Sequence, residues 1–262
     1  MATTLSLCNV PPWVLGSREY NEIPTKLEIQ GVRHDNRKFF AMLDDVSDVP
    51  TRSQMFEDYM TVKFRLHEDD DSQTEGARRS LKNDYLRFLR GWGVDSSSVE
   101  GAVIKAWTES RFGLAPAYHR GRLSPDNEVT WLRYAEDRMR GSAKTNAIYA
   151  QLDLVYEYCQ YELQRQKGGI LSQELFRGTN DPHDYELREI VDRRKRTVRL
   201  NSIGSFATDV ERAWEFGATV WKVYVPTPKI VFYESLCATS VLRGEGEVVA
   251  LGGDYLVEQI MY

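Results

Sequence analysis

The strongest constraint on the fold is a change in the spacing of apolar residues at Gly168-Gly169. Before these glycines, from about residue 77 to residue 166, apolar side chains recur at helical spacing, as in Leu152, Val155 and Cys159. After them come short apolar runs separated by Gly, Pro, Asn and Asp, which is typical of a mainly antiparallel sheet. The sequence therefore predicts an α+β protein, with a mainly helical region at residues 1–166 and a β-rich region at residues 167–262.

Local signals predict the individual elements. Residues 1–66 look irregular but hold enough apolar side chains to predict a packed arm, and Ser97 with Glu100 is a candidate capping box for a helix. Short helices are predicted at 184–194 and 209–216. Strands are predicted at residues 170–176, 198–200, 219–225, 230–233, 248–251 and 255–261.

Composition excludes several classes of protein. The chain of 262 residues is 42% hydrophobic with a net charge of −5, which argues against disorder and against a general attraction to nucleic acid. No apolar run has membrane-spanning length and no secretory signal is recognisable, so we expect a cytoplasmic protein without membrane insertion. The three cysteines and four histidines are scattered, so no metal site is predicted.

Three short stretches of the β-rich region carry side chains suited to chemistry. They contain Arg177 before Gly178, Ser205 on a predicted strand, and Glu245 with Glu247. Residues two apart in a strand project to the same face, so we expect the two carboxylates to enter one cleft. Neighbouring carboxylates repel and raise each other's pKa, so this pair suits a cationic substrate or transition state better than it suits stability.

The common nucleotide-binding motifs are absent from the sequence. Gly244 and Gly246 are followed by Val249 rather than by a third glycine, and the chain has neither a phosphate-binding Gly-Lys-Ser/Thr loop nor a Gly-x-Ser-x-Gly elbow. A phosphate-bearing ligand must therefore be held in another way. Arg177 is suitable, because a guanidinium binds phosphate oxygens through paired hydrogen bonds.

The order of arginine, serine and Glu-x-Glu resembles the R-S-E class of mono-ADP-ribosyltransferases. Ser205 and the residues at 209–216 are similar to the serine-bearing strand of that class and the helix after it. Ala207 is a departure, because many relatives carry a second serine there. The resemblance implies that the β-rich region is a split antiparallel β-sandwich, the ADP-ribosyltransferase core, and that NAD is the substrate.

The resemblance also implies the catalytic residues. Cleavage of the nicotinamide–ribose bond leaves positive charge on the ribose, and a catalyst must place negative charge beside it. Glu247 would stabilise that cation and bind a ribose hydroxyl. Glu245 would orient the guanidinium of an acceptor arginine, and Glu-x-Glu spacing is the mark of arginine as acceptor in this class. No metal is needed for this chemistry.

Four further residues would bind NAD by the same resemblance. Arg177 would hold the phosphates, and the backbone of Gly178 would hold the carboxamide of nicotinamide, where a missing side chain allows close approach. Ser205 would fix the ribose and the local strand. Phe216 would stack on nicotinamide, although it could equally be a core residue.

The whole chain is similar to one branch of the class, the dinitrogenase reductase ADP-ribosyltransferases of nitrogen-fixing bacteria, notably at residues 9–13 and 176–180. The branch implies transfer to dinitrogenase reductase, the iron protein of nitrogenase, which switches nitrogen fixation off, and regulation by a PII-type signalling protein. Two alternatives stay open, an NAD glycohydrolase and an inactive NAD-binding module. Glu245 argues against the first, and Arg177, Ser205 and Glu247 together argue against the second.

Overall fold

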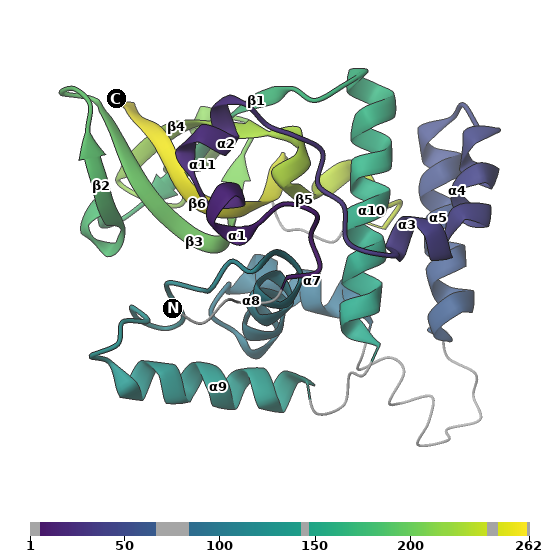
Figure 1. Ribbon diagram of the computed structural model, residues 1–262, viewed down its shortest axis with the longest axis horizontal. Helices are drawn as coiled ribbons and strands as arrows, with labels where there is room; N and C mark the ends of the chain where they lie inside the picture. The colour runs from purple at the N-terminus through teal and green to yellow at the C-terminus, as the bar shows by residue number, and fades with distance from the viewer. Residues whose placement is uncertain (1–5, 67–83, 143–146, 240–245, 261–262) are drawn as a thin grey trace.

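The computed structural model describes residues 6–66, 84–142, 147–239 and 246–260, and it has the predicted α+β class (Figure 1). A helical part of the chain is followed by antiparallel strands, and none of the helices in the described ranges is long and apolar enough to cross a membrane. The helices before the strands are α1 (Pro12–Leu15), α2 (Arg18–Glu22), α3 (Val32–Asp35), α4 (Arg37–Asp44), α5 (Val49–Phe64), α7 (Tyr85–Val94), α8 (Val99–Phe112), α9 (Glu128–Ser142) and α10 (Ile148–Lys167).

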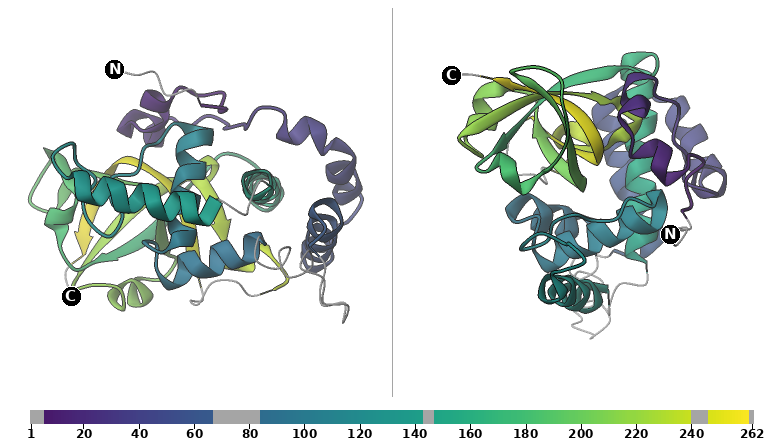
Figure 2. Two further views of the ribbon diagram at one scale, coloured as in Figure 1. Left: turned by 90° about the horizontal axis from the view of Figure 1, so that it is seen from below. Right: turned by 60° about the vertical axis from the view of Figure 1, so that its left-hand side comes forward.

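The helical part is arranged around α8 and α10. Ser98 caps the start of α8 by accepting a hydrogen bond from the Gly101 amide, and Gly113 ends it in the left-handed conformation. The prediction of Ser97 as the cap was therefore wrong by one residue. α8 packs against α7, α9 and the sheet, with α9 on its outer side, while α10 stands between the sheet and the α4–α5 pair (Figures 1 and 2).

The strands form one six-stranded antiparallel sheet in the order β2-β3-β1-β4-β6-β5. An additional ladder joins β3 to β6, so that β1, β4, β6 and β3 form a closed circuit of pairings. A short helix, α11 (Val210–Trp214), follows β3 as predicted. The strands are β1 (Ser172–Thr179), β2 (Glu186–Ile190), β3 (Lys195–Ala207), β4 (Thr219–Pro226), β5 (Ile230–Tyr233) and β6 (Glu247–Ile260).

Three sequence-based predictions of elements were wrong. Residues 6–66 are not irregular, because α1 to α5 lie within them, although the arm is packed as expected. The helix predicted at 184–194 is β2 with its flanking turns, in which every residue of the strand is exposed. The two strands predicted at the C-terminal end are the single strand β6, which passes through Gly252 and Gly253 without ending.

The helical and β-rich regions share a hydrophobic core. One cluster of buried side chains includes Phe56, Trp107 and Tyr156 from the helices and Phe232 and Leu251 from the strands. The change from helix to strand falls between α10 and β1, close to the boundary predicted at residues 166 and 167. The division into two domains at that boundary stays a prediction.

Candidate active site

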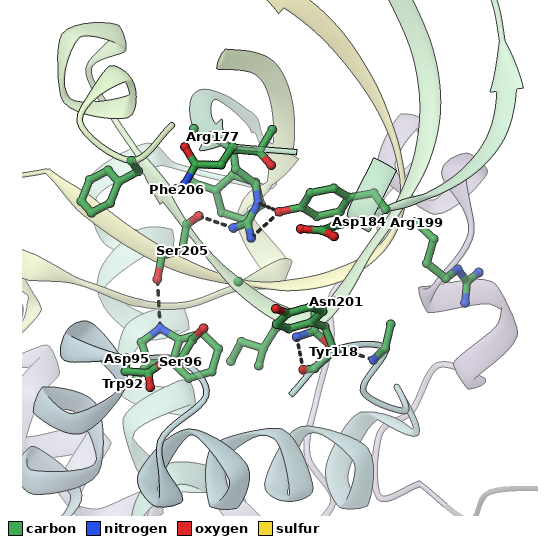
Figure 3. Close-up of a pocket in the computed structure, with 18 of the residues that line it drawn as sticks. Trp92, Asp95, Ser96, Tyr118, Arg177, Asp184, Arg199, Asn201, Ser205 and Phe206 are labelled. Carbon is green, nitrogen blue, oxygen red and sulfur yellow. Dashed lines mark hydrogen bonds between the residues drawn. The ribbon is translucent and has the colours of Figure 1, made fainter. Parts of the chain in front are cut away.

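A pocket of about 1290 Å³ lies between the two regions (Figure 3). One wall comes from residues 92–96 at the end of α7 and from residues 117–126 between α8 and α9. The other comes from β1, β3, α11 and the start of β6. Five of the predicted site residues line it together, while the sixth, Glu245, lies outside the described residues. The five are Arg177, Gly178, Ser205, Phe216 and Glu247.

The guanidinium of Arg177 lies across β3 and is held on both sides. Its Nη1 donates to the carbonyl oxygen of Ser205 at 2.7 Å, and its Nε and Nη2 donate to the hydroxyl oxygen of Tyr185 at 3.2 and 3.1 Å. Gly204 makes room for it, since a Cβ there would lie 3.0 Å from Nη1. These bonds use three of the five N–H groups of the arginine, which leaves donors to bind an anion.

Tyr185 is a site residue that the sequence did not reveal. It follows the turn after β1, in a segment that was predicted as helix, and no local pattern distinguishes it from any other tyrosine. Its ring packs edge-on against Trp221 with centroids 4.9 Å apart. Burial alone would raise the pKa of its hydroxyl, but the charge and hydrogen bonds of Arg177 outweigh burial and lower the pKa below its ordinary value.

Ser205 and Glu247 meet because of the register between β3 and β6. Ala207 pairs with Glu247 and Ser205 with Val249, so Ser205 and Glu247 are diagonal neighbours on one face. Burial raises the pKa of Glu247 above its ordinary value, the neighbouring Ser205 hydroxyl opposes the rise, and the nearby Glu234 carboxylate adds to it.

Gly246 forms a turn immediately before Glu247. Its φ of +80° is in the left-handed region, and a Cβ there would lie 2.2 Å from the Thr208 hydroxyl, so only glycine fits. Its amide donates to the Glu234 carboxylate at 2.6 Å, and its carbonyl accepts from the Thr208 amide at 3.0 Å. Regular strand geometry therefore begins only at Glu247. The expectation that Glu245 shares its face by strand alternation stays a prediction.

Gly178 and Phe216 are adjacent in the pocket. A Cβ on Gly178 would lie 2.1 Å from the carbonyl oxygen of Ala213, so glycine is required here by the packing of β1 against α11. Phe216 is 64% exposed, which shows that the alternative of a core residue was wrong. Its exposed ring remains available to pack on a ligand.

The wall from the helical region is bonded to the strands. The Nε1 of Trp92 donates to the Ser205 hydroxyl oxygen at 2.9 Å (Figure 3). At the other end of the pocket, the Asn201 side chain accepts from the amides of Ala117 and Tyr118 and donates to the Tyr118 carbonyl at 3.0 Å. Trp92 is a buried residue of α7, and no local feature of the sequence indicates its contact with Ser205.

The pocket offers one oriented guanidinium for an anion and a carboxylate for a part of the ligand that becomes cationic. Arg122, Arg177, Arg199 and Arg212 line it together with several acidic residues. Arg199 and Arg212 are paired with Asp254 and Glu215, so the anion-binding role falls to Arg177, while Glu247 is at the end where Ser205 lies. Its volume exceeds the ~300–1,000 Å³ of common small-molecule sites, so it can accept a dinucleotide. Within the described ranges, no group of three or more His, Cys, Asp or Glu side chains is placed to hold a metal ion.

Comparison with known proteins identifies relatives over nearly the whole chain. The family model described as dinitrogenase reductase ADP-ribosyltransferase matches residues 5–259. A curated protein of Rhodospirillum rubrum, named NAD(+)–dinitrogen-reductase ADP-D-ribosyltransferase, is 39% identical over 257 residues, which cover 97% of this chain and 93% of that protein. No solved structure matches the chain.

Proposed function

The chain belongs to the dinitrogenase reductase ADP-ribosyltransferase family, and on that premise we propose that it transfers ADP-ribose from NAD to an arginine side chain of dinitrogenase reductase. Nicotinamide is released, and the modification switches nitrogen fixation off. The observation that carries the proposal is the meeting of Arg177, Ser205 and Glu247 in one pocket of a chain with these relatives. Regulation by a PII-type signalling protein stays an expectation from the family resemblance, and a cytoplasmic location stays a prediction from the sequence.

The contacts of Arg177 support its role in binding the NAD phosphates. Its position is fixed by the Ser205 carbonyl and by Tyr185, so binding an anion costs little further side-chain entropy. The exposed ring of Phe216 beside Gly178 would pack on nicotinamide, and the backbone of Gly178 would bind its carboxamide. These residues would orient the dinucleotide with its nicotinamide ribose near Ser205.

Glu247 would act on the ribose as the nicotinamide bond breaks. A carboxylate that is already oriented stabilises the developing cation without reorganising at the moment of reaction. Its partial burial strengthens that interaction, because water screens it less. Glu245 would then orient the acceptor guanidinium and favour its nucleophilic form. The nitrogen of the arginine forms the new bond to the ribose carbon from which nicotinamide has left.

Incubation with labelled NAD and purified dinitrogenase reductase tests the proposal. The wild type should label an arginine of the target, and Glu247→Gln should lower the rate by a factor on the order of 100 or more, as for loss of a preorganised electrostatic group. Glu245→Gln should abolish transfer but retain part of the NAD hydrolysis. Glu258→Gln is the matched control, because Glu258 lies on the same strand but pairs with Lys222, away from the pocket.

The alternatives give different outcomes. Free ADP-ribose without labelled protein would identify an NAD glycohydrolase. NAD binding without any turnover would identify an inactive binding module. Label on a residue other than arginine would support the transferase activity but contradict arginine as the acceptor residue.

A further inference from the structure

Trp92 connects the helical region to the centre of the candidate site. It lies on the last turns of α7, is 3% exposed, and its Nε1 is 2.9 Å from the Ser205 hydroxyl oxygen. Ser205 is the residue whose carbonyl accepts from Arg177 and whose side chain is the diagonal neighbour of Glu247 across β3 and β6. One indole from the helices therefore contacts the serine that joins the proposed phosphate-binding and catalytic residues.

The direction of each hydrogen bond follows from the chemistry of the groups. The indole N–H can only donate, so the Ser205 oxygen must accept from Trp92. The proton of the serine is then free to point elsewhere, and the Glu247 carboxylate is the acceptor beside it. Without the indole N–H, the Ser205 hydroxyl could rotate among its staggered orientations, and its proton would no longer be directed toward Glu247.

We propose that Trp92 is a positioning residue, which holds the Ser205 hydroxyl in the orientation that hydrogen-bonds the Glu247 carboxylate. The inference rests on the proposed function, and it gives the helical region a part in NAD cleavage itself. Trp92 acts through Ser205 and has no direct role in bond breaking.

The packing around the indole is suited to this task. The next four residues along the chain also line the pocket, so the end of α7 forms part of its wall. α7 is tightly packed against α8, since a Cβ on Gly91 would lie 2.6 Å from the Glu100 side chain. On the other side the Lys105 ammonium lies 5.9 Å from the Trp92 ring. A rigidly packed ring can direct the hydroxyl of Ser205 at little entropic cost.

The test replaces Trp92 by phenylalanine, which keeps an aromatic ring and removes the N–H. We expect kcat for NAD cleavage to fall about tenfold, the effect of one lost hydrogen bond, with little change in KM for NAD. The acid limb of the pH profile should move to higher pH, because the oriented Ser205 hydroxyl favours the ionised form of Glu247. Trp107→Phe is the matched control, since Trp107 is a buried indole on α8 that donates to Asp153 at 2.7 Å, away from the pocket.

A double-mutant cycle with Ser205→Ala separates positioning from packing. If Trp92 acts through the Ser205 hydroxyl, Trp92→Phe should have no further effect on kcat in the Ser205→Ala protein. An equal tenfold loss in both backgrounds, or a Trp92→Phe protein that behaves like Trp107→Phe, would overturn the inference. If Trp92→Phe does not fold, the isosteric 3-benzothienylalanine at position 92 removes the same N–H without changing the shape.

Failure of the inference can be told from failure of the proposed function. A wild-type protein that neither cleaves NAD nor labels the target would refute the function itself. An active wild type with an unaffected Trp92→Phe variant would refute only the positioning role.

Discussion

At the scale of single residues, Glu157 is a buried carboxyl outside the candidate site. It lies on α10, is 6% exposed, and accepts a weak hydrogen bond of 3.4 Å from the Ile29 amide. Burial raises its pKa to about 7, and the nearby charge of Arg33 only partly opposes the rise. Near neutral pH the folded protein therefore holds a proton that the unfolded chain has already released.

This difference in bound protons between the folded and unfolded states sets the sign of the pH dependence of stability. The native state binds more protons than the unfolded state between the ordinary pKa of glutamate and about 7, so this group makes the free energy of unfolding decrease as pH rises. Glu157→Gln should remove this decrease in the free energy of unfolding. Between about pH 5 and pH 8 the free energy of unfolding of the variant should rise by about 2 kcal/mol relative to that of the wild type, as measured by urea unfolding.

The exposed carboxyl of Glu22 provides a control for this measurement. Glu22→Gln should follow the wild type at both pH values, because Glu22 is an exposed side chain that pairs with Arg18. A Glu157→Gln protein with the same pH dependence as the wild type would show that the buried carboxyl is already ionised.

Some residues of the candidate site could be predicted from the sequence, and others could not. Arg177, Ser205 and Glu247 stand in short motifs with a fixed order, so a linear pattern was enough to predict them. Tyr185 and Trp92 have no such pattern, because their roles come from contacts made by folding. The Trp92 side chain reaches a serine 113 positions away, a partner that neither propensity nor periodicity can identify.

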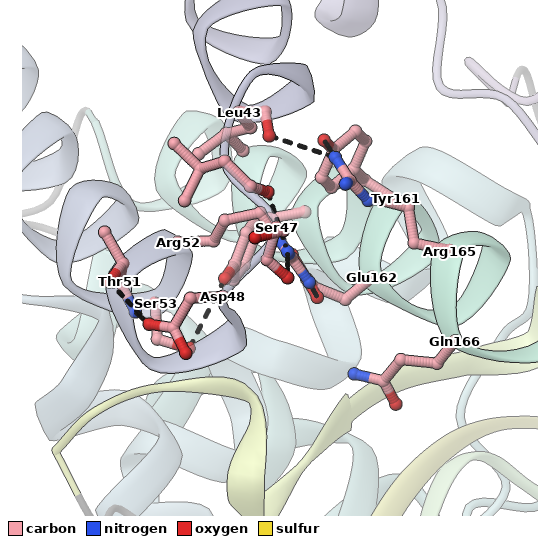
Figure 4. A network of polar contacts seen from close by, with 12 residues as sticks. Leu43, Ser47, Asp48, Thr51, Arg52, Ser53, Tyr161, Glu162, Arg165 and Gln166 are labelled. Carbon is pink, nitrogen blue, oxygen red and sulfur yellow. Dashed lines mark hydrogen bonds and ion pairs between the residues drawn. The ribbon is translucent and has the colours of Figure 1, made fainter.

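At the scale of elements, a buried ion pair joins α5 to α10 (Figure 4). Arg52 and Glu162 are 2% and 1% exposed and form two parallel hydrogen bonds of 2.6 and 2.7 Å. The Nη1 of Arg52 donates to the carbonyls of Val46 and Ser47 before α5, at 2.9 and 2.8 Å. The guanidinium thus fixes the loop before one helix onto the side of another.

Removal of one partner should be more harmful than removal of both. Arg52→Met leaves a buried carboxylate without its cation, so we expect a loss of ~3–5 kcal/mol in the free energy of unfolding. The double variant Arg52→Met/Glu162→Leu should recover much of that loss, although the carbonyls of Val46 and Ser47 stay without the arginine. Denaturant unfolding of the three proteins measures both effects.

For this comparison the exposed pair of Lys26 and Glu28 sets the baseline, and Lys26→Met should leave stability nearly unchanged. A double variant no more stable than Arg52→Met alone would indicate that the carbonyl contacts, rather than the charge pair, stabilise this junction.

The strand β6 shows why one prediction from the sequence was wrong. Glycine usually interrupts a strand, so Gly252 and Gly253 led us to expect two strands with a break between them. They instead adjoin a bulge on β3, since the register shifts between Leu200 and Ile203. A Cβ on Gly252 would lie 1.6 Å from the carbonyl oxygen of Asn201, so the glycine allows the two strands to approach. The sequence of β6 alone therefore does not show that it is one continuous strand, because the glycines are explained only by its pairing with β3.

At the scale of the whole molecule, α10 is the main link between the helices and the sheet. Tyr156 donates to the Pro228 carbonyl at 2.9 Å, and Gln160 donates to the carbonyls of Thr227 and Ile230 at 3.1 and 2.6 Å. These bonds satisfy backbone groups in the connection from β4 to β5. The α+β class and the order of the two regions could be predicted from periodicity, but the shared core could not, because it depends on which faces meet.

The shared core predicts that the β-rich region does not fold alone. A fragment of residues 167–262 lacks α10, so it exposes core side chains such as Phe232 and loses the bonds to the β4–β5 connection. We expect it to lack a cooperative thermal transition, while the full chain unfolds in one step by both near- and far-ultraviolet circular dichroism. A cooperatively folded fragment would establish the boundary at residue 167 as a true domain boundary.

The position of the pocket between the two regions has a consequence for motion. A dinucleotide bound there would touch both walls, so it would bind fully only while the walls keep their spacing. By mass action, the bound molecule would disfavour conformations in which α7 moves away from β3. We therefore expect the ligand to act as a reversible cross-link, which slows backbone hydrogen exchange on both sides of the pocket until the products leave.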